Sequence, residues 1–314
     1  MSTKIAFLFP GQGSQAVGMG RNLAERFPIA AQTFAEADEA LGFSLSKLIF
    51  EGPETDLRLT ENTQPAILTV SVAAWRVLRE HGIEPALAAG HSLGEWSAHV
   101  AAGTLQFAEA VRAVKARGRA MQLAVPAGEG AMAAVLSSSP EWVLEACAEA
   151  EAETGLVVAA ANLNSPTQTV ISGALAAVEK ASALAKAKGA RRALMLPVSA
   201  PFHCSLMQPA QDEVARVLGS SEIAEPKIPV AANVTGGMVS TAAEAKDVLT
   251  RQVTGAVRWI DCVQALKAAG AEVFVEVGPG KVLCGLLKQI DPELKTMNVE
   301  DAASLEKALA ELKG

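Results

Sequence analysis

The chain has 314 residues, of which 50% are hydrophobic, and a formal net charge of −7. This length allows one large domain, or two of ordinary size, with a substantial core. An acidic chain lacks the basic surface that phosphate neutralisation needs, so we expect no nucleic-acid partner. Every apolar run is shorter than the roughly 18 residues that a membrane span needs, so we also expect no membrane partner.

Strands and helices alternate in the first part of the sequence. Residues 4–9 form a short apolar pattern typical of a strand, and PALAAG at 85–90 is a second buried strand. Helical patterns are predicted at residues 65–79, 93–102 and 107–123, with Pro65 in a first-turn position where its missing N–H costs nothing. This alternation predicts a mainly parallel sheet with helices on both faces.

The pattern changes after residue 128 to strand, helix, strand, strand, helix, strand. The corresponding ranges are 131–136, 140–152, 156–163, 167–172, 175–188 and 191–196. This order is that of the ferredoxin-like split unit. We therefore predict an α/β fold in which residues 1–128 and 198–314 form a large hydrolase-like domain and residues 129–197 form an inserted, ferredoxin-like α+β domain.

A serine elbow follows the strand at 85–90. The stretch GHSLGE, Gly90 to Glu95, fits G-x-S-x-G, the strand-to-helix turn that presents a nucleophilic serine. Such a serine could instead cap a helix. The strand before it, the helix after it and the helix N-terminus beneath it all favour Ser92 as a nucleophile. Hydrolases use this elbow, and so do enzymes that transfer an acyl group to an acceptor other than water.

A glycine loop, FPGQGSQA, follows the first strand. It fits G-x-G-x-x-A, but the acids that a dinucleotide site would need lie inside helical sequence, so a nicotinamide cofactor is not favoured. An acyl-transfer site needs a second oxyanion donor from a loop of this kind. The main-chain N–H groups of Gln12 and Leu93 are the predicted oxyanion hole.

A serine nucleophile needs a base, and the chain has four histidines. His91 precedes Ser92, and neighbouring side chains of a strand point to opposite faces. His81 ends a polar helix, and His99 lies in the helix after the elbow, where packing or surface roles are common. His203 lies in the loop VSAPFHC, outside any regular pattern. By elimination, His203 is the predicted base.

The acid of a hydrolase triad is absent from its usual place. Chain order in such hydrolases puts an Asp or Glu between the serine and the histidine. No aspartate lies between Ser92 and His203, and the glutamates there, Glu95 among them, mostly occupy helical patterns that face solvent. We therefore expect a backbone carbonyl to orient the imidazole.

Seven ordered motifs carry a family resemblance. They are FPGQGSQ, TQPAI, GHSLGE, RGRAMQ, AANLNSPTQTVISG, PVSAPFH and VEVGPG, and they extend from Phe9 to Gly280. Together they closely resemble the malonyl-CoA:acyl carrier protein transacylases and the related acyltransferase domains of fatty-acid and polyketide synthases. The resemblance implies a hydrolase-like domain with a ferredoxin-like insert.

The resemblance also implies catalytic roles. Ser92 would be the nucleophile and His203 the base, with the N–H groups of Gln12 and Leu93 as the oxyanion hole. Gln252, in the loop before V-R-W, would supply a main-chain carbonyl to the histidine.

For the substrate, the resemblance implies that Arg117, the first arginine of RGRAMQ, binds the free carboxylate of a malonyl group. Arginine suits this task because its planar guanidinium group can donate two parallel hydrogen bonds to a carboxylate. Gln64 of TQPAI is also placed with the substrate, and Phe202 would leave little room for a methyl branch.

The implied reaction is ping-pong transfer of malonyl from malonyl-CoA to the phosphopantetheine thiol of an acyl carrier protein. No cofactor would be bound, because coenzyme A arrives as the substrate thioester and phosphopantetheine belongs to the partner. A carrier protein is acidic, so we expect it to dock on a basic surface. The candidates are Lys186, Lys188 and Arg191, with Lys180, Arg192, Lys281 and Lys288 as further cations.

Compartment and assembly complete the expectations. The four cysteines show no C-x-x-C pair and no metal-ligand spacing; they are Cys147, Cys204, Cys262 and Cys284. We therefore expect reduced thiols and no metal site. We also expect no signal peptide, a cytoplasmic location and a monomer. Two alternatives remain open: a discrete acyltransferase of a polyketide pathway, and a serine hydrolase or thioesterase, which would release free malonate.

Overall fold

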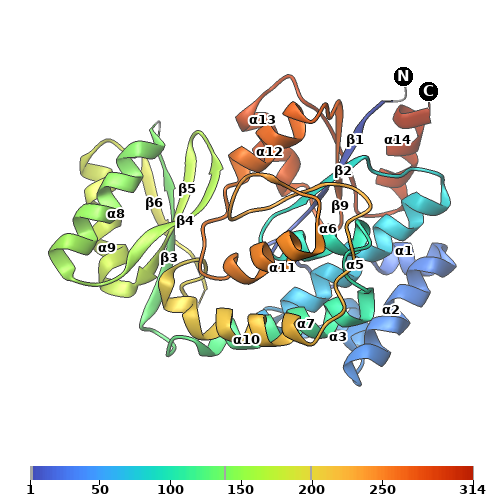
Figure 1. Cartoon of the computed structure of the whole chain (residues 1–314), viewed down its shortest axis with the longest axis horizontal. Coiled ribbons are helices and arrows are strands. Elements are labelled where there is room, and N and C mark those ends of the chain that lie inside the picture. Colours follow the sequence, from blue (N-terminus) through green and yellow to red (C-terminus); the bar gives the residue numbers. More distant parts are fainter. Residues whose placement is uncertain (1–2, 138, 199, 314) are drawn as a thin grey trace.

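The computed structural model describes residues 3–137, 139–198 and 200–313, which form two sheets with helices packed around them (Figure 1). In the described part of the chain, the larger sheet has the strand order β10-β9-β1-β2-β7-β8. All pairs in it are parallel except β7 with β8. Its strands are β1 (Ile5–Phe9), β2 (Leu87–Gly90), β7 (Val230–Ala231), β8 (Met238–Val239), β9 (Val273–Val277) and β10 (Lys295–Val299).

Strand β1 shows why this sheet lies between two layers of helices. Its side chains alternate between two separate clusters: Phe7 and Phe9 pack in one core, and Ala6 and Leu8 pack in the other. A strand that is buried on both faces reads as a continuous apolar run, and IAFLF does so.

Helices of the large domain cover the two faces. The helices in this part of the structure are α1 (Arg21–Arg26), α2 (Pro28–Leu41), α3 (Leu45–Glu51), α4 (Glu54–Leu57), α5 (Thr60–Glu80), α6 (Leu93–Ala101), α7 (Phe107–Leu123), α10 (Gln208–Gly219), α11 (Ala242–Arg251), α12 (Trp259–Ala268), α13 (Val282–Ile290) and α14 (Ala302–Lys313), with a 3₁₀ turn at Ser205–Met207. Residues of α5, α6 and α7 belong to the core of Phe7, and residues of α12 and α13 to the core of Leu8.

The start of α5 differs from the expectation. The helix begins at Thr60, so Pro65 lies inside it and not in its first turn. Contacts with the preceding loop extend the helix backwards: Thr63 donates its hydroxyl to the carbonyl of Leu57 and its N–H to that of Leu59.

The second sheet is antiparallel and belongs to a small domain. It comprises β3 (Gly130–Leu136), β4 (Val158–Ser165), β5 (Gln168–Ala174) and β6 (Arg192–Met195), with α8 (Pro140–Thr154) and α9 (Leu175–Ala187) packed on it. Among the described residues the strand order is β4-β5-β3-β6, which places the first and third strands of the unit side by side at the centre. The predicted fold class, a hydrolase-like α/β domain with a ferredoxin-like insert, is confirmed.

The small domain is hydrogen-bonded to the large one along β4. The N–H of Val257 donates to the carbonyl of Ala161 at 2.8 Å, and the N–H of Leu163 donates to the carbonyl of Val257 at 2.9 Å. The hydroxyl of Ser165 also donates to the side-chain oxygen of Gln289 on α13 at 2.8 Å. A further hydrogen bond, between Asn164 of β4 and His91 of the serine elbow at 2.8 Å, places the small domain beside the end of β2.

Candidate active site

The glycines of the elbow are required by close packing. A Cβ added at Gly90 would lie 1.9 Å from the carbonyl carbon of Gly94, and one added at Gly94 would lie 1.9 Å from the carbonyl oxygen of Phe9. Between them Ser92 has φ 50° and ψ −106°, and its hydroxyl makes no capping bond to α6. The tight turn therefore exposes the hydroxyl instead of using it as a helix cap.

Asn233 holds the strained turn, and sequence reasoning missed it. Its side-chain oxygen accepts the N–H of Ser92 at 2.7 Å, and its side-chain nitrogen donates to the carbonyl of Gly90 at 2.8 Å. Asn233 lies just after β7, the strand beside β2. Its position in a neighbouring strand's loop gave no signal in the linear sequence.

His203 meets Ser92, and two carbonyls orient its ring. The serine Oγ lies 2.7 Å from His203 Nε2, while Nδ1 lies 2.9 Å from the carbonyl oxygen of Gln252 and 3.1 Å from that of Gly255. Because a carbonyl oxygen can only accept, Nδ1 carries the proton. Nε2 is then free to accept the serine proton, as a general base must.

The surroundings keep this imidazole neutral. Burial, together with the charge of Arg117, lowers the pKa of His203 from 6.5 to about 3, although the Gln252 carbonyl opposes the shift. In the unfolded chain the ring would bind a proton at higher pH than in the folded protein. The free energy of unfolding is therefore expected to fall as the pH drops below 6.5.

The same shift predicts the pH dependence of serine acylation. The rate should stay constant from about pH 7 down to about pH 5, because the base is already deprotonated across this range. The measurement is single-turnover acylation followed by quenched mass spectrometry, with the His81→Gln variant as a control for a histidine outside the site. An acid limb near 6.5, the ordinary pKa of histidine, would contradict the neutral buried base.

Arg117 lies against the nucleophile. Its two terminal nitrogens donate to the side-chain oxygen of Gln64 at 2.8 Å, to that of Gln252 at 2.9 Å and to Ser92 Oγ at 3.2 Å. Burial lowers the pKa of Arg117 to about 10, and the neighbouring Glu95 opposes the shift, so the side chain remains a cation at neutral pH. An acidic acyl group on the serine would thus meet a fixed positive charge.

Gly118 explains how Arg117 and Gln64 come together. A Cβ on Gly118 would lie 2.6 Å from the carbonyl oxygen of Thr60, so α7 and α5 pack closely only because this residue is glycine. That approach brings the Arg117 and Gln64 side chains into contact. The glycine of the RGRAMQ motif is therefore a packing requirement for the arginine site.

The predicted oxyanion donors flank the serine. Gly11 packs on the elbow so closely that an added Cβ would lie 2.4 Å from the carbonyl oxygen of His91, and this contact brings Gln12 to the cavity that Ser92 lines. Within the described ranges, the N–H groups of Gln12 and Leu93 donate to no other residue. Both are therefore available to a ligand oxygen.

A cavity of about 260 Å³ opens over these groups. The glycine loop, Ser92, His203 and Phe202 line one part of it, α13 contributes Leu283 and Leu286, and the small domain contributes Met132, Val170 and Leu196. Phe202 precedes His203 in the chain, is buried and lines this cavity. The apolar walls suit an extended thioester chain.

The other histidines do not reach Ser92. His91 Nε2 lies 2.8 Å from the side-chain oxygen of Asn164, and His81 Nδ1 lies 2.9 Å from the Val77 carbonyl. His99 is fully buried, and neither of its ring nitrogens has a partner among the described residues. His99 therefore packs in the interior, as one of the two expected roles required, but it is not the satisfied histidine that was expected, because its ring finds no hydrogen-bond partner in the described part of the chain.

Glu95 corrects the expectation of solvent-facing glutamates. It has no exposed surface, and its Oε2 accepts from the side chain of Gln252 at 2.6 Å and from the N–H of Asn233 at 3.0 Å. Burial raises its pKa to about 7, opposed by Asn233, Gln252 and the charge of Arg117. The helical pattern predicted an exposed Glu95, but α6 lies between the sheet, α5 and α7, where even its polar residues are buried.

The basic residues of the small domain differ in their partners. Lys188 pairs with Glu145 at 3.5 Å and with Glu149 at 3.2 Å, and Lys180 pairs with Glu153 at 2.6 Å. Lys186 and Arg191 are exposed and make no ion pair with the residues that the structure describes. These two cations are therefore the more available to a partner.

In residues 3–137, 139–198 and 200–313, no cluster of three or more His, Cys, Asp or Glu side chains could hold a metal ion. No helix in those ranges is long and apolar enough to cross a membrane.

Comparison with known proteins identifies the family. A family model described as the acyl transferase domain matches residues 6–308. The malonyl CoA-acyl carrier protein transacylase of Bacillus subtilis (strain 168) is 49% identical over 311 residues, 99% of this chain and 98% of that protein.

Solved structures agree with this match. An acyl carrier protein S-malonyltransferase from Vibrio cholerae O1 biovar eltor superposes with a TM-score of 0.94 at 50% identity, covering 98% of this chain and all of that one. A malonyl-transacylase in complex with a type II PKS acyl-carrier protein gives a TM-score of 0.95 at 46% identity, covering 98% of this chain and 100% of its own. The predicted family is confirmed, and the chain belongs to the acyl transferase domain family of enzymes.

Proposed function

We propose that this protein transfers a malonyl group from malonyl-CoA to the phosphopantetheine thiol of an acyl carrier protein, through a malonyl ester on Ser92. The observation that carries the proposal is the buried guanidinium of Arg117, 3.2 Å from the nucleophilic oxygen. A permanent cation at that distance favours an acyl group that ends in a carboxylate. The names of the matched relatives give the same reaction.

In the first half-reaction His203 takes the proton of Ser92 while the serine oxygen attacks the thioester carbonyl. The N–H groups of Gln12 and Leu93 hold the tetrahedral oxyanion, and the carbonyl of Gln252 stabilises the imidazolium through Nδ1–H. The protonated His203 then gives its proton to the departing thiolate of coenzyme A. Malonyl is left as an ester, with its carboxylate against Arg117 and within reach of Gln64.

In the second half-reaction the phosphopantetheine thiol enters the same cavity. His203 removes the thiol proton, the thiolate attacks the ester, and the serine recovers its proton as the new thioester leaves. Phe202 beside the base limits the space for branched acyl groups. We place carrier docking on Lys186, Lys188 and Arg191, and we expect a cytoplasmic monomer that needs no bound cofactor.

A serine hydrolase is not favoured. Among the described residues no carboxylate contacts His203, whose ring is held by carbonyls, and a hydrolase has no need of a cation beside its nucleophile. A discrete acyltransferase of a polyketide pathway would carry out the same chemistry on a different carrier.

The deciding experiment is intact mass spectrometry of the protein with malonyl-CoA, followed by holo acyl carrier protein. We expect the protein to gain the mass of one malonyl group and to lose it when the carrier is added, with malonyl appearing on the carrier. Release of free malonate with an unmodified carrier would instead indicate a hydrolase.

The docking surface has its own test. Reversing charge in the Lys186→Glu and Arg191→Glu double variant should raise the KM for carrier protein several-fold by removing favourable attraction, and leave acylation by malonyl-CoA unchanged. Lys307→Glu, on α14 at the opposite end of the molecule from α9, is the matched control (Figure 1). An unchanged KM in the double variant would reject this surface.

A further inference from the structure

Glu95 is a buried carboxylate that the proposed mechanism does not use. It lies in the first turn of α6, three residues after the nucleophile, and no part of it is exposed. Burying a carboxylate is costly unless hydrogen bonds satisfy it. Its Oε2 receives two, from the side-chain nitrogen of Gln252 at 2.6 Å and from the N–H of Asn233 at 3.0 Å, whereas its Oε1 has no partner among the described residues.

The Gln252 amide has one favourable orientation in this environment. Its nitrogen faces three acceptors: Glu95 Oε2, the carbonyl oxygen of Ser92 at 3.0 Å and the side-chain oxygen of Asn233 at 3.3 Å. Its oxygen faces the guanidinium of Arg117 at 2.9 Å. A flipped amide would set its oxygen against the carbonyl oxygen of Ser92 and the side-chain oxygen of Asn233, and its NH₂ against a cation, which is repulsive at both ends.

We infer that Glu95 is a positioning residue that fixes the Gln252 amide so that its oxygen aims the Arg117 guanidinium at the acyl group on Ser92. The inference rests on the proposed role of Arg117 as the ligand of the malonyl carboxylate. Gln64 holds the other terminal nitrogen of the same guanidinium. Glu95 and Gln64 thus fix Arg117 from two sides, one of them through Gln252.

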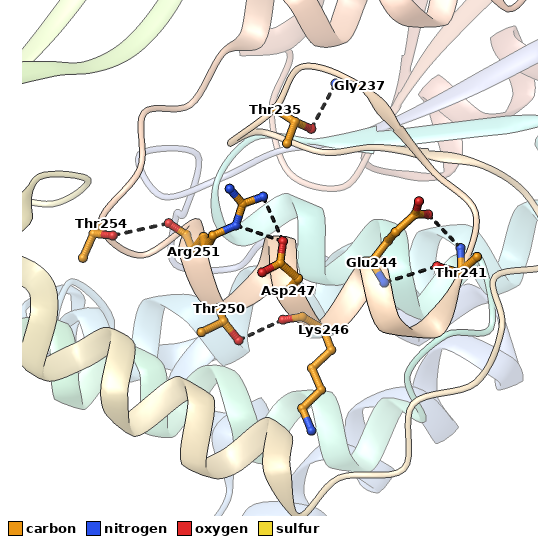
Figure 2. A network of polar contacts seen from close by, with 9 residues as sticks. All are labelled: Thr235, Gly237, Thr241, Glu244, Lys246, Asp247, Thr250, Arg251 and Thr254. Atoms are coloured by element: carbon orange, nitrogen blue, oxygen red, sulfur yellow. Dashed lines mark hydrogen bonds and ion pairs between the residues drawn. The ribbon is translucent and has the colours of Figure 1, made fainter.

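The main chain of Gln252 does not depend on Glu95. Gln252 follows the last residue of α11 and donates its N–H to Val248 of that helix at 2.8 Å. The helix is fixed at its start by the capping box of Thr241 and Glu244, as Figure 2 shows. The carbonyl that orients His203 is therefore set by α11, and only the side-chain amide is set by Glu95.

This separation predicts a selective effect. Losing the Glu95 contact should weaken the hold of Arg117 on a carboxylate. Asn233 also loses the acceptor of its N–H, but its side chain keeps its two bonds to Ser92 and Gly90, so the serine, the base and the oxyanion donors should stay in place. Acylation by malonyl-CoA should suffer, and acylation by acetyl-CoA, which offers no carboxylate, should not. A residue that merely stabilised the fold would affect both donors alike.

Two substitutions at this position distinguish contact from charge. Glu95→Gln keeps the length and an acceptor oxygen but removes the charge, whereas Glu95→Asp keeps the charge but is too short to reach Gln252. We expect Glu95→Asp to lower kcat/KM for malonyl-CoA about tenfold relative to acetyl-CoA, as for a lost hydrogen bond to a charged network, and Glu95→Gln to retain most of the malonyl preference.

The matched control is Glu276→Asp. Glu276 is another fully buried glutamate, and it binds the N–H groups of Leu283 and Cys284 away from Arg117. Its shortening should leave the ratio of the two donors unchanged. Thermal unfolding of each variant shows whether it folds. The kcat/KM values for malonyl-CoA and acetyl-CoA are measured on one preparation of each variant, so a loss of folded protein lowers both values equally and leaves their ratio unchanged.

The inference is overturned if Glu95→Asp lowers both donors by the same factor, or if Glu95→Asp keeps the preference and Glu95→Gln loses it. The first result would show that Glu95 only supports the fold. The second would show that the preference for malonyl-CoA depends on the charge of Glu95 and not on its contact with Gln252. Failure of the proposed function is distinguishable, because the wild-type protein itself would then form no malonyl ester or show no preference for malonyl-CoA over acetyl-CoA.

Discussion

Replacement of Ser92 by alanine is expected to abolish the malonyl adduct and to lower transfer to carrier protein by roughly 10⁴-fold or more, as for loss of the nucleophile in other serine enzymes. The hydroxyl lies 2.7 Å from the base and is the atom on which the acyl group would reside between the two thiols. Intact mass spectrometry after exposure to malonyl-CoA measures the adduct, and a coupled assay of free coenzyme A measures the turnover.

Ser97→Ala is the matched control for this variant. Ser97 lies in α6, the helix that follows Ser92, is buried, and has a hydroxyl without a partner among the described residues, so its loss removes no hydrogen bond. It should be acylated like the wild-type protein. A malonyl adduct that persists on Ser92→Ala would assign the nucleophile to another residue and would overturn the mechanism.

Replacement of Arg117 by alanine is expected to lower kcat/KM for malonyl-CoA by about 30-fold to several thousand-fold, equivalent to roughly 2–5 kcal/mol for a buried charge pair that loses one partner. Acylation by acetyl-CoA should fall far less, because acetyl presents no carboxylate. Arg117→Lys should also be slow with malonyl-CoA, since an ammonium group cannot replace the planar guanidinium that Gln64 and Gln252 hold by its two terminal nitrogens.

Arg119→Ala tests whether any arginine of α7 has this effect. Arg119 lies two residues further along the helix and is exposed, so its loss should leave both donors unchanged. Equal losses for malonyl-CoA and acetyl-CoA in Arg117→Ala would show that the arginine supports the site's structure and does not recognise the carboxylate.

Much of the fold followed from local patterns. The continuous apolar strand at residues 5–9 and the switch to strand, helix, strand, strand, helix, strand after residue 128 each required only a few neighbouring residues to recognise. The serine elbow was equally easy to recognise, because its motif spans six consecutive residues and Gly90 packs on the turn's own Gly94, although Gly94 is required by a contact with Phe9 of β1. The start of α5 was harder, since its first turn depends on contacts with the preceding loop.

The acidic residue near the nucleophile shows where sequence reasoning stopped. Glu95 occupies a helical position that reads as solvent-facing, and its burial became visible only once α6 was placed between the sheet and two other helices. Asn233 was missed for a related reason: its two bonds to the elbow cross from a different strand. A side chain's partner in space has no fixed sequence separation.

The sequence by itself determined the local geometry around Ser92, the class of base, the absence of an aspartate from the hydrolase position and the family of enzymes. Only the tertiary structure decided how His203 is oriented, because the acceptor is a main-chain carbonyl of Gln252, and every residue type carries a carbonyl. It also decided that Gln252 and Glu95 connect to Arg117. Burial and the direction of hydrogen bonds arise from packing between distant segments, which local spacing does not encode.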